Sequence, residues 1–108
     1  MRTVKLLLDY LQGPIWTSDV QTGKPCTGIA VVDNDEDLRK VNLEISNLYS
    51  SYYEFDSHGQ ACWFNEEQEK ADKQKMLNLL GRLNVRLAEI NDGSFEVEDL
   101  ETPRIQDL

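Results

Sequence analysis

The sequence predicts an α+β fold in which a short β-sheet packs against two main α-helices. Two stretches with helical periodicity occupy the middle of the chain, and segments with the alternating pattern of β-strands lie near both ends. Elements that are apolar on one face bury that face against another layer of secondary structure. With 108 residues, the chain is expected to form a single domain, 1–108, whose terminal strands lie near each other in one sheet.

Residues 3–11 predict the first strand. Val4, Leu6 and Leu8 alternate with a second set of residues that is also largely apolar, which is typical of a strand inside a sheet rather than at its edge. Gly13-Pro14 ends the pattern, because proline has no backbone N–H. Residues 15–16 then predict a short extended segment, and residues 17–28 a loop with a turn at 22–24. Residues 29–32 are consistent with a short strand or an extended lead-in to a helix.

The first helix is predicted to follow an acidic run at residues 33–37. Asp33 or Asn34 is expected to cap it, with Asp35, Glu36 and Asp37 in the first turn, where the helix dipole favours negative charge. The apolar residues that follow are spaced three and four apart, so they form one stripe on the helix. They are Leu38, Val41, Ile45, Leu48 and Tyr52.

The second helix is predicted to begin after Asn65, with Gln68 in the capping-box position. Its apolar stripe comprises Met76, Leu80, Leu83, Leu87 and Ile90, widened by Leu79 and Ala88. Residues 66–75 are nearly all polar, which predicts that this half lies on the surface. Residues 91–93 form a stop signal, residues 95–98 predict a final strand, and residues 103–108 are expected to be a frayed tail. Residues 54–64 predict a loop between the helices, with turn residues at 56–59.

The charge of the chain restricts its partners. Asp and Glu number 20 against 11 Lys and Arg, which gives a net charge of −9. Such a chain repels nucleic acid and anionic membranes and attracts basic protein surfaces. The same acidity is also explained by solubility alone. The sequence shows neither a secretory signal nor a membrane-spanning run, so we expect a cytoplasmic protein.

Few residues suggest catalysis. His58 lies near Asp56 and Cys62, but neighbours in sequence do not make a catalytic triad. Fragments of a phosphate loop at residues 23–25 and of a calcium loop at 33–35 lack their other ligands. We therefore expect no enzyme and no cofactor or metal. Cys26 and Cys62 lack disulfide or zinc spacing and are expected to be reduced, partly buried small side chains.

Aromatic and acidic residues gather between the two predicted helices, which indicates a protein-binding surface. We expect Tyr53 to anchor a partner there and the nearby acids to pair with its Lys and Arg; these are Glu54, Asp56, Glu66 and Glu67. The alternative is that the aromatic residues cap the core beneath a loop. A second candidate surface is the start of the first helix, with Asp35 and Glu36.

Short motifs along the chain resemble those of small bacterial immunity proteins. Residues 4–10, V-K-L-L-L-D-Y, are similar to the family's opening K-L-x-x-E/D-Y strand, and Pro14-Ile15-Trp16 is similar to its P-L-W segment. An acidic helix and a Glu-rich second helix follow in the same order, here from Asp35 and from Asn65. The chain departs from the family pattern at 59–64, where the family has Ser-Gly-Phe, and at 24–26.

This resemblance implies an immunity protein of a contact-dependent growth inhibition or other polymorphic toxin system. Such a protein binds a toxin domain delivered by neighbouring bacteria and neutralises it in the cytosol. A nuclease, and preferably a ribonuclease, is the expected toxin, because its cleft is lined with Lys and Arg that suit a protein of charge −9. We expect a monomer that binds its toxin 1:1 and binds neither nucleic acid nor membrane. The alternative is an acidic adaptor or regulatory module for another basic protein.

Overall fold

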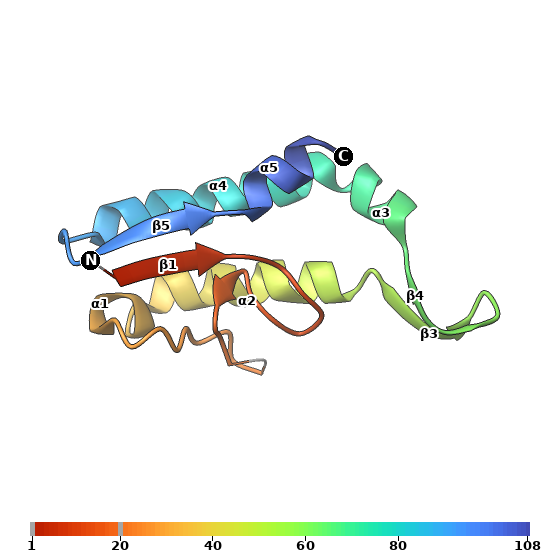
Figure 1. The fold of residues 1–108 in the computed structure, drawn as a ribbon, viewed down its shortest axis with the longest axis horizontal. Helices are drawn as coiled ribbons and strands as arrows, with labels where there is room; N and C mark the ends of the chain where they lie inside the picture. Colours follow the sequence, from red (N-terminus) through yellow and green to blue (C-terminus); the bar gives the residue numbers. More distant parts are fainter. Residues whose placement is uncertain (1, 20) are drawn as a thin grey trace.

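The computed structural model describes residues 2–19 and 21–108, apart from the side chain of Ser57. It has the predicted α+β fold, with helices packed against a small sheet (Figure 1). The elements are, in chain order, β1 (Arg2–Leu6), β2 (Ile15–Trp16), α1 (Ala30–Asp33), α2 (Glu36–Ser50), β3 (Tyr53–Ser57), β4 (Gln60–Phe64), α3 (Glu66–Ala71), α4 (Lys73–Ile90), β5 (Phe95–Asp99) and α5 (Glu101–Gln106).

β1 lies between β2 and β5 in a three-stranded sheet, as the pattern of residues 3–11 predicts. It pairs antiparallel with β2, with Leu6 opposite Ile15, and parallel with β5, with Val4 opposite Val97. The strands nearest the two ends of the chain, β1 and β5, are therefore neighbours in one sheet, which confirms the prediction. The regular part of β1 is shorter than residues 3–11, because pairing with β5 ends at Leu6 and the chain reverses at Tyr10 and Leu11, beyond the Asp9–Gln12 bridge.

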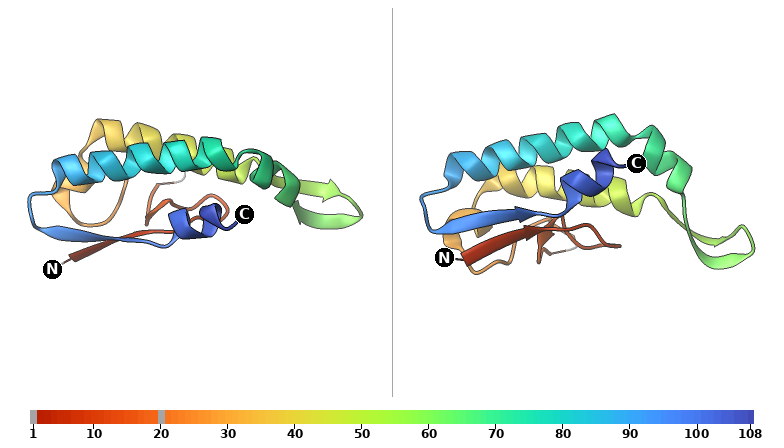
Figure 2. Two further views of the ribbon diagram at one scale, coloured as in Figure 1. Left: turned by 90° about the horizontal axis from the view of Figure 1, so that it is seen from above. Right: turned by 45° about the horizontal axis from the view of Figure 1, so that its top comes forward.

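α2 and α4 lie side by side over one face of this sheet (Figure 2). The predicted stripes face inward, with Leu48 and Ile90 only partly buried at the margins, whereas Ala88 is exposed and does not widen the stripe of α4. The core between the layers includes Val4, Leu6, Ile15, Leu38, Ile45, Met76, Leu80, Leu83, Leu87 and Phe95.

A buried amide secures the loop between β2 and α1. Asn42 of α2 accepts a hydrogen bond from the Ile15 N–H (3.0 Å) and donates to Ser18 Oγ (2.9 Å) and to the Gly23 carbonyl (2.8 Å). A buried polar group needs such partners. Gly23 has a φ of +74°, and a Cβ there would lie 2.5 Å from Leu43 Cβ. Both the conformation and the close approach therefore require glycine.

The chain before α2 differs from the prediction. Of residues 29–32 only Ile29 is extended; residues 30–32 are helical, because α1 begins at Ala30. Asp33 does not cap α2; its carboxylate accepts hydrogen bonds from the Thr27 and Gly28 N–H groups, each at 2.9 Å. Asp35 is the cap, and it accepts from the Leu38 N–H at 2.9 Å.

The segment between the two main helices is a β-hairpin rather than a loop. β3 and β4 pair antiparallel, with Tyr53 opposite Phe64 and Glu54 opposite Trp63. The turn is made by His58 and Gly59, with φ values of +53° and +72°, as tight hairpin turns require. The hairpin extends from one end of the molecule, away from the sheet and the main helices (Figures 1 and 2).

The second predicted helix is two helices, α3 and α4, that meet at Asp72. Asn65 caps α3 by accepting from the Gln68 N–H at 3.0 Å, as predicted. The Asp72 carboxylate accepts from the Tyr52 hydroxyl (2.9 Å) and the Gln68 side-chain amide (3.1 Å), and makes no capping bond to α4. Within residues 66–75, Glu69 is buried rather than at the surface.

The C-terminal segment is not frayed. α5 begins at Glu101, and both Glu101 and Ile105 are buried. Pro103 is accommodated because it lies in the first turn, where backbone N–H groups have no partner within the helix.

The cysteine prediction is also wrong in one respect, since Cys26 and Cys62 are free but exposed rather than partly buried.

Candidate functional site

A cluster of aromatic side chains forms the base of the hairpin. Tyr53 lies at its centre, with ring centroids 4.8 Å from Tyr10 and 4.9 Å from Phe64, in edge-to-face geometry. Tyr49, in the last turn of α2, and Tyr52, just after this helix, also contact the Phe64 ring. Edge-to-face rings at such distances attract each other through their quadrupoles. We call these residues, with Phe55, the aromatic cluster, and it makes the hairpin base rigid.

The outer edge of this cluster is open to solvent. Phe55 is 54% exposed, and Tyr10 (38%) and Leu11 (42%), in the chain that follows β1, are exposed as well. The ring centroids of Tyr10 and Phe55 are 5.6 Å apart, and the Leu11 N–H donates to Ser50 Oγ at 3.2 Å. Exposed aromatic and aliphatic groups gathered in this way are typical of protein interfaces. The sequence pointed to Tyr53, but that side chain is half-buried, and Phe55 is the more exposed of the two.

The opposite face of the hairpin carries an indole and an imidazole. The rings of His58 and Trp63 stack with centroids 3.8 Å apart. Glu54 lies 3.6 Å from His58 Nε2 and accepts from the Asn65 side-chain amide at 3.3 Å. Cys62 is opposite Phe55 in the register, and successive strand residues point to opposite faces. His58 and Cys62 therefore lie on different faces, and the structure does not bring them together as a base and a nucleophile.

A hollow separates this face from the start of α3. It is lined by His58, Gln60, Trp63, Phe64, Glu66 and Glu67. The carboxylates of Glu66 and Glu67 are exposed and, within the described chain, make no hydrogen bond or ion pair. Asp56, at the hairpin tip, is exposed in the same way. Three of the four predicted charge partners are thus free to meet a basic protein, and Glu54 lies beside them.

The second candidate surface, at the start of α2, has a different character. Asp35 accepts from Arg86 Nε at 2.8 Å and from its terminal nitrogen, and its side chain is only 11% exposed. These bonds hold the pKa of Asp35 below its usual value. Glu36 is paired with Arg39, which likewise lowers its pKa. Asp35 and Glu36 are therefore already paired with arginines of the same chain, and of the acids at this surface only the exposed Asp37 has no ion pair within the described residues.

A buried ionic network fixes α3, and with it the hairpin. Arg104 of α5 donates to Glu69 Oε2 (2.9 Å) and to Glu101 Oε2 (3.0 Å), and its guanidinium lies 5.8 Å from the Tyr49 ring centroid. Glu101 Oε1 accepts from the Leu8 N–H at 3.0 Å. Burial raises the pKa of Glu101, against the opposing effects of the Leu8 N–H and Arg104. The network thus joins α3 to the chain segment that carries Tyr10.

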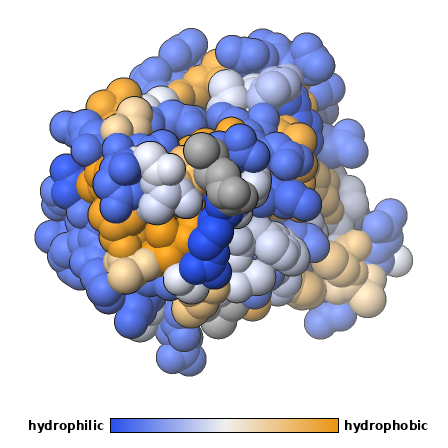
Figure 3. Space-filling view, turned by 60° about the vertical axis from the view of Figure 1, so that its left-hand side comes forward, coloured by the Kyte–Doolittle hydropathy of each residue, from blue (hydrophilic) through white to orange (hydrophobic). Residues whose placement is uncertain are grey.

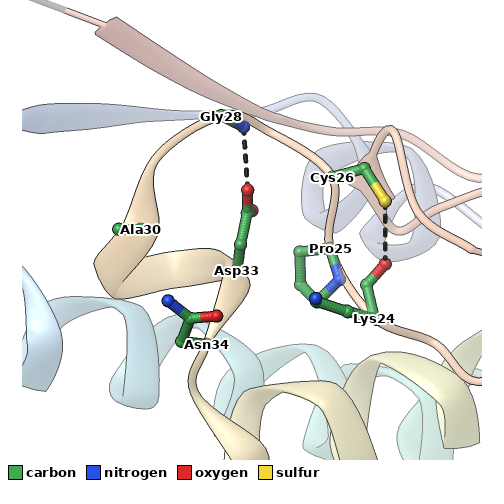
Figure 4. A pocket seen from close by; sticks show the side chains of 7 residues that line it. All are labelled: Lys24, Pro25, Cys26, Gly28, Ala30, Asp33 and Asn34. Atoms are coloured by element: carbon green, nitrogen blue, oxygen red, sulfur yellow. Dashed lines mark hydrogen bonds between the residues drawn. The ribbon is translucent and has the colours of Figure 1, made fainter.

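A second hollow, between the β2–α1 loop and α1, is lined by Lys24, Pro25, Cys26, Gly28, Ala30, Asp33 and Asn34 (Figure 4). The Asp33 carboxylate points at the Gly28 N–H, and the Cys26 thiol lies 3.5 Å from the Lys24 carbonyl (Figure 4). Asp33 therefore shapes the loop rather than a ligand site. The end of the molecule at which α1 lies is largely hydrophilic, with a small apolar patch (Figure 3).

Comparisons with protein-family models, curated proteins and solved structures found no match to this chain. No helix in residues 2–19 and 21–108 is long and apolar enough to cross a membrane. The same residues contain no group of His, Cys, Asp and Glu arranged to hold a metal ion. The feature that remains is the hairpin surface, which combines exposed rings, unpaired carboxylates and a hollow.

Proposed function

We propose that the protein is an immunity protein, which binds and neutralises a basic toxin domain delivered by neighbouring bacteria. The observation that carries the proposal is the contrast between its two acidic surfaces. At the start of α2 the two predicted charge partners, Asp35 and Glu36, are paired with Arg86 and Arg39, whereas Glu66, Glu67 and Asp56 have no partner in the described chain. Glu66 and Glu67 share a hollow with the stacked rings of His58 and Trp63, and unpaired carboxylates beside aromatic rings favour a basic protein partner.

The form of the hairpin also supports the proposal. It stands clear of the sheet and main helices (Figure 1), so it can enter a concave site on a partner. The clefts of nucleases are lined with Lys and Arg that bind phosphates. The carboxylates of Asp56, Glu66 and Glu67 would occupy the positions of those phosphates, and the net charge of −9 would speed association. A ribonuclease domain acting in the cytosol is our preferred target.

The decisive experiment is co-purification with the product of the neighbouring gene, followed by a nuclease assay with and without this protein. We expect a 1:1 complex and loss of RNA cleavage when the protein is added. Binding without any effect on the partner's activity would instead support an acidic adaptor. If neither binding nor inhibition occurs, the proposal is wrong.

A further inference from the structure

The hollow between the hairpin and α3 has walls of two chemical kinds. One wall is the Trp63 indole with the His58 imidazole stacked on it. The other holds Glu66 and Glu67, whose carboxylates are unpaired among the residues that the structure describes. Acidic residues in the first turn of α3 are explained by the helix dipole alone. The dipole does not explain why they face an aromatic ring across a concave surface.

We infer that this hollow receives an arginine side chain of the partner protein. A guanidinium group is planar, so it can lie against the Trp63 ring while its N–H groups donate to Glu66 or Glu67. No Lys or Arg is among the residues that line the hollow. The inference rests on the proposed function, since it assigns the partner chemistry of the same surface.

Arginine fits the two walls better than lysine does. The guanidinium is weakly hydrated and has five donors in a fixed plane, so it can stack on a ring and donate hydrogen bonds to a carboxylate at the same time. The lysine ammonium is a compact and strongly hydrated charge, which loses more hydration on meeting the ring. A hollow with carboxylates alone would not distinguish the two. The Trp63 ring therefore predicts selectivity for arginine of about two- to fivefold over lysine.

The test needs no toxin. The protein is titrated with N-acetyl-arginine amide and, separately, with N-acetyl-lysine amide, while the two indole N–H signals are followed by NMR. We expect the Trp63 signal to shift and saturate with the arginine amide, and lysine to bind about two- to fivefold more weakly. Trp16, which is on the sheet and 38% exposed, serves as an internal control whose signal should not move.

The variant that tests the mechanism is Glu66→Gln with Glu67→Gln, which keeps the shape of both side chains and removes their charge. We expect it to abolish saturable binding of the arginine amide, with the amide spectrum of the rest of the protein unchanged. Equal binding of the two amides, equal shifts at Trp16 and Trp63, or full binding by the variant would each overturn the inference. If the toxin is nevertheless inhibited by the wild-type protein, the proposed function stands and only the arginine site is rejected.

Discussion

Replacing Arg104 by Met tests how the hairpin is attached to the body of the protein. The substitution keeps much of the side-chain volume but leaves Glu69 and Glu101 without their shared cation. The side chains of these glutamates are only 5% and 1% exposed. Removing one partner of a buried ion pair costs about 3–5 kcal/mol, because a charge is left buried and unpaired. Arg104 is itself 39% exposed, so we expect the lower end, about 3 kcal/mol.

A loss of about 3 kcal/mol is a large share of the stability of a small domain, which is roughly 5–15 kcal/mol. It corresponds to a fall in Tm of about 10–20 °C. The loss should also depend on pH. The folded state holds the Glu101 proton more tightly than the unfolded state, so stability falls as pH rises from 4.5 through the raised pKa. Without Arg104 that pKa rises further, so the variant should lose more stability at about pH 7 than at about pH 4.

The assay is urea denaturation followed by circular dichroism at both pH values. Arg82→Met is the matched control, because Arg82 pairs with Glu44 at 3.7 Å and their side chains are 61% and 53% exposed. We expect the control to cost less than about 1 kcal/mol. Adding Glu69→Gln to Arg104→Met removes one unpaired charge and should restore part of the stability. Equal, small losses for Arg104→Met and the control would refute this account of the network.

Three further changes test other parts of the fold. Asp35→Asn should make the free energy of unfolding less dependent on pH in the acid range. The pKa of Asp35 is lowered in the folded protein, so wild-type stability is lost as pH falls from 3.8 through the folded-state value. Acid titration monitored by fluorescence measures this dependence. Leu80→Ala and Leu83→Ala, both at fully buried positions, should each cost about 2–5 kcal/mol in urea denaturation, and midpoints near wild type would disprove the predicted stripe. Gly23→Ala should lower the Tm more than Gly93→Ala, because both have positive φ but a Cβ meets other atoms within 4 Å only at Gly23; equal Tm values would contradict the close approach.

Periodicity in the sequence was enough to predict the central layers of the fold. The alternation around Val4 and around Phe95 predicted the two paired strands, and the stripes of α2 and α4 predicted the buried helix faces. The hairpin was missed because its turn is His58-Gly59, whereas Asn or Asp is the usual residue before glycine in such turns. The sequence did not predict α5, because a proline such as Pro103 often ends regular structure, although proline is tolerated in the first turn of a helix.

The character of the candidate site depended on contacts between residues distant in sequence. The pairing of Asp35 with Arg86 spans 51 positions, and that of Arg104 with Glu69 spans 35. No local pattern distinguishes these carboxylates from the unpaired ones at Glu66 and Glu67. The sequence predicted the surface between the helices first and the start of the first helix second, but it did not show that Asp35 and Glu36 are paired within the chain. The sequence also did not predict the contribution of Tyr10, because this residue is distant in sequence from the other members of the aromatic cluster.

The proposed function requires that a basic partner bind specifically at the hairpin surface, and not at any acidic surface through net charge alone. Glu66→Lys with Glu67→Lys can be compared with Glu96→Lys with Glu98→Lys, at exposed positions of the sheet. Each substitution adds two units of charge, so both double variants change the net charge from −9 to −5. The measurement is the dissociation rate from the co-purified partner. We expect the hairpin variant to dissociate at least about tenfold faster than the sheet variant, because close charge reversal costs more than about 1.4 kcal/mol. Equal dissociation rates for the two variants would contradict the claim.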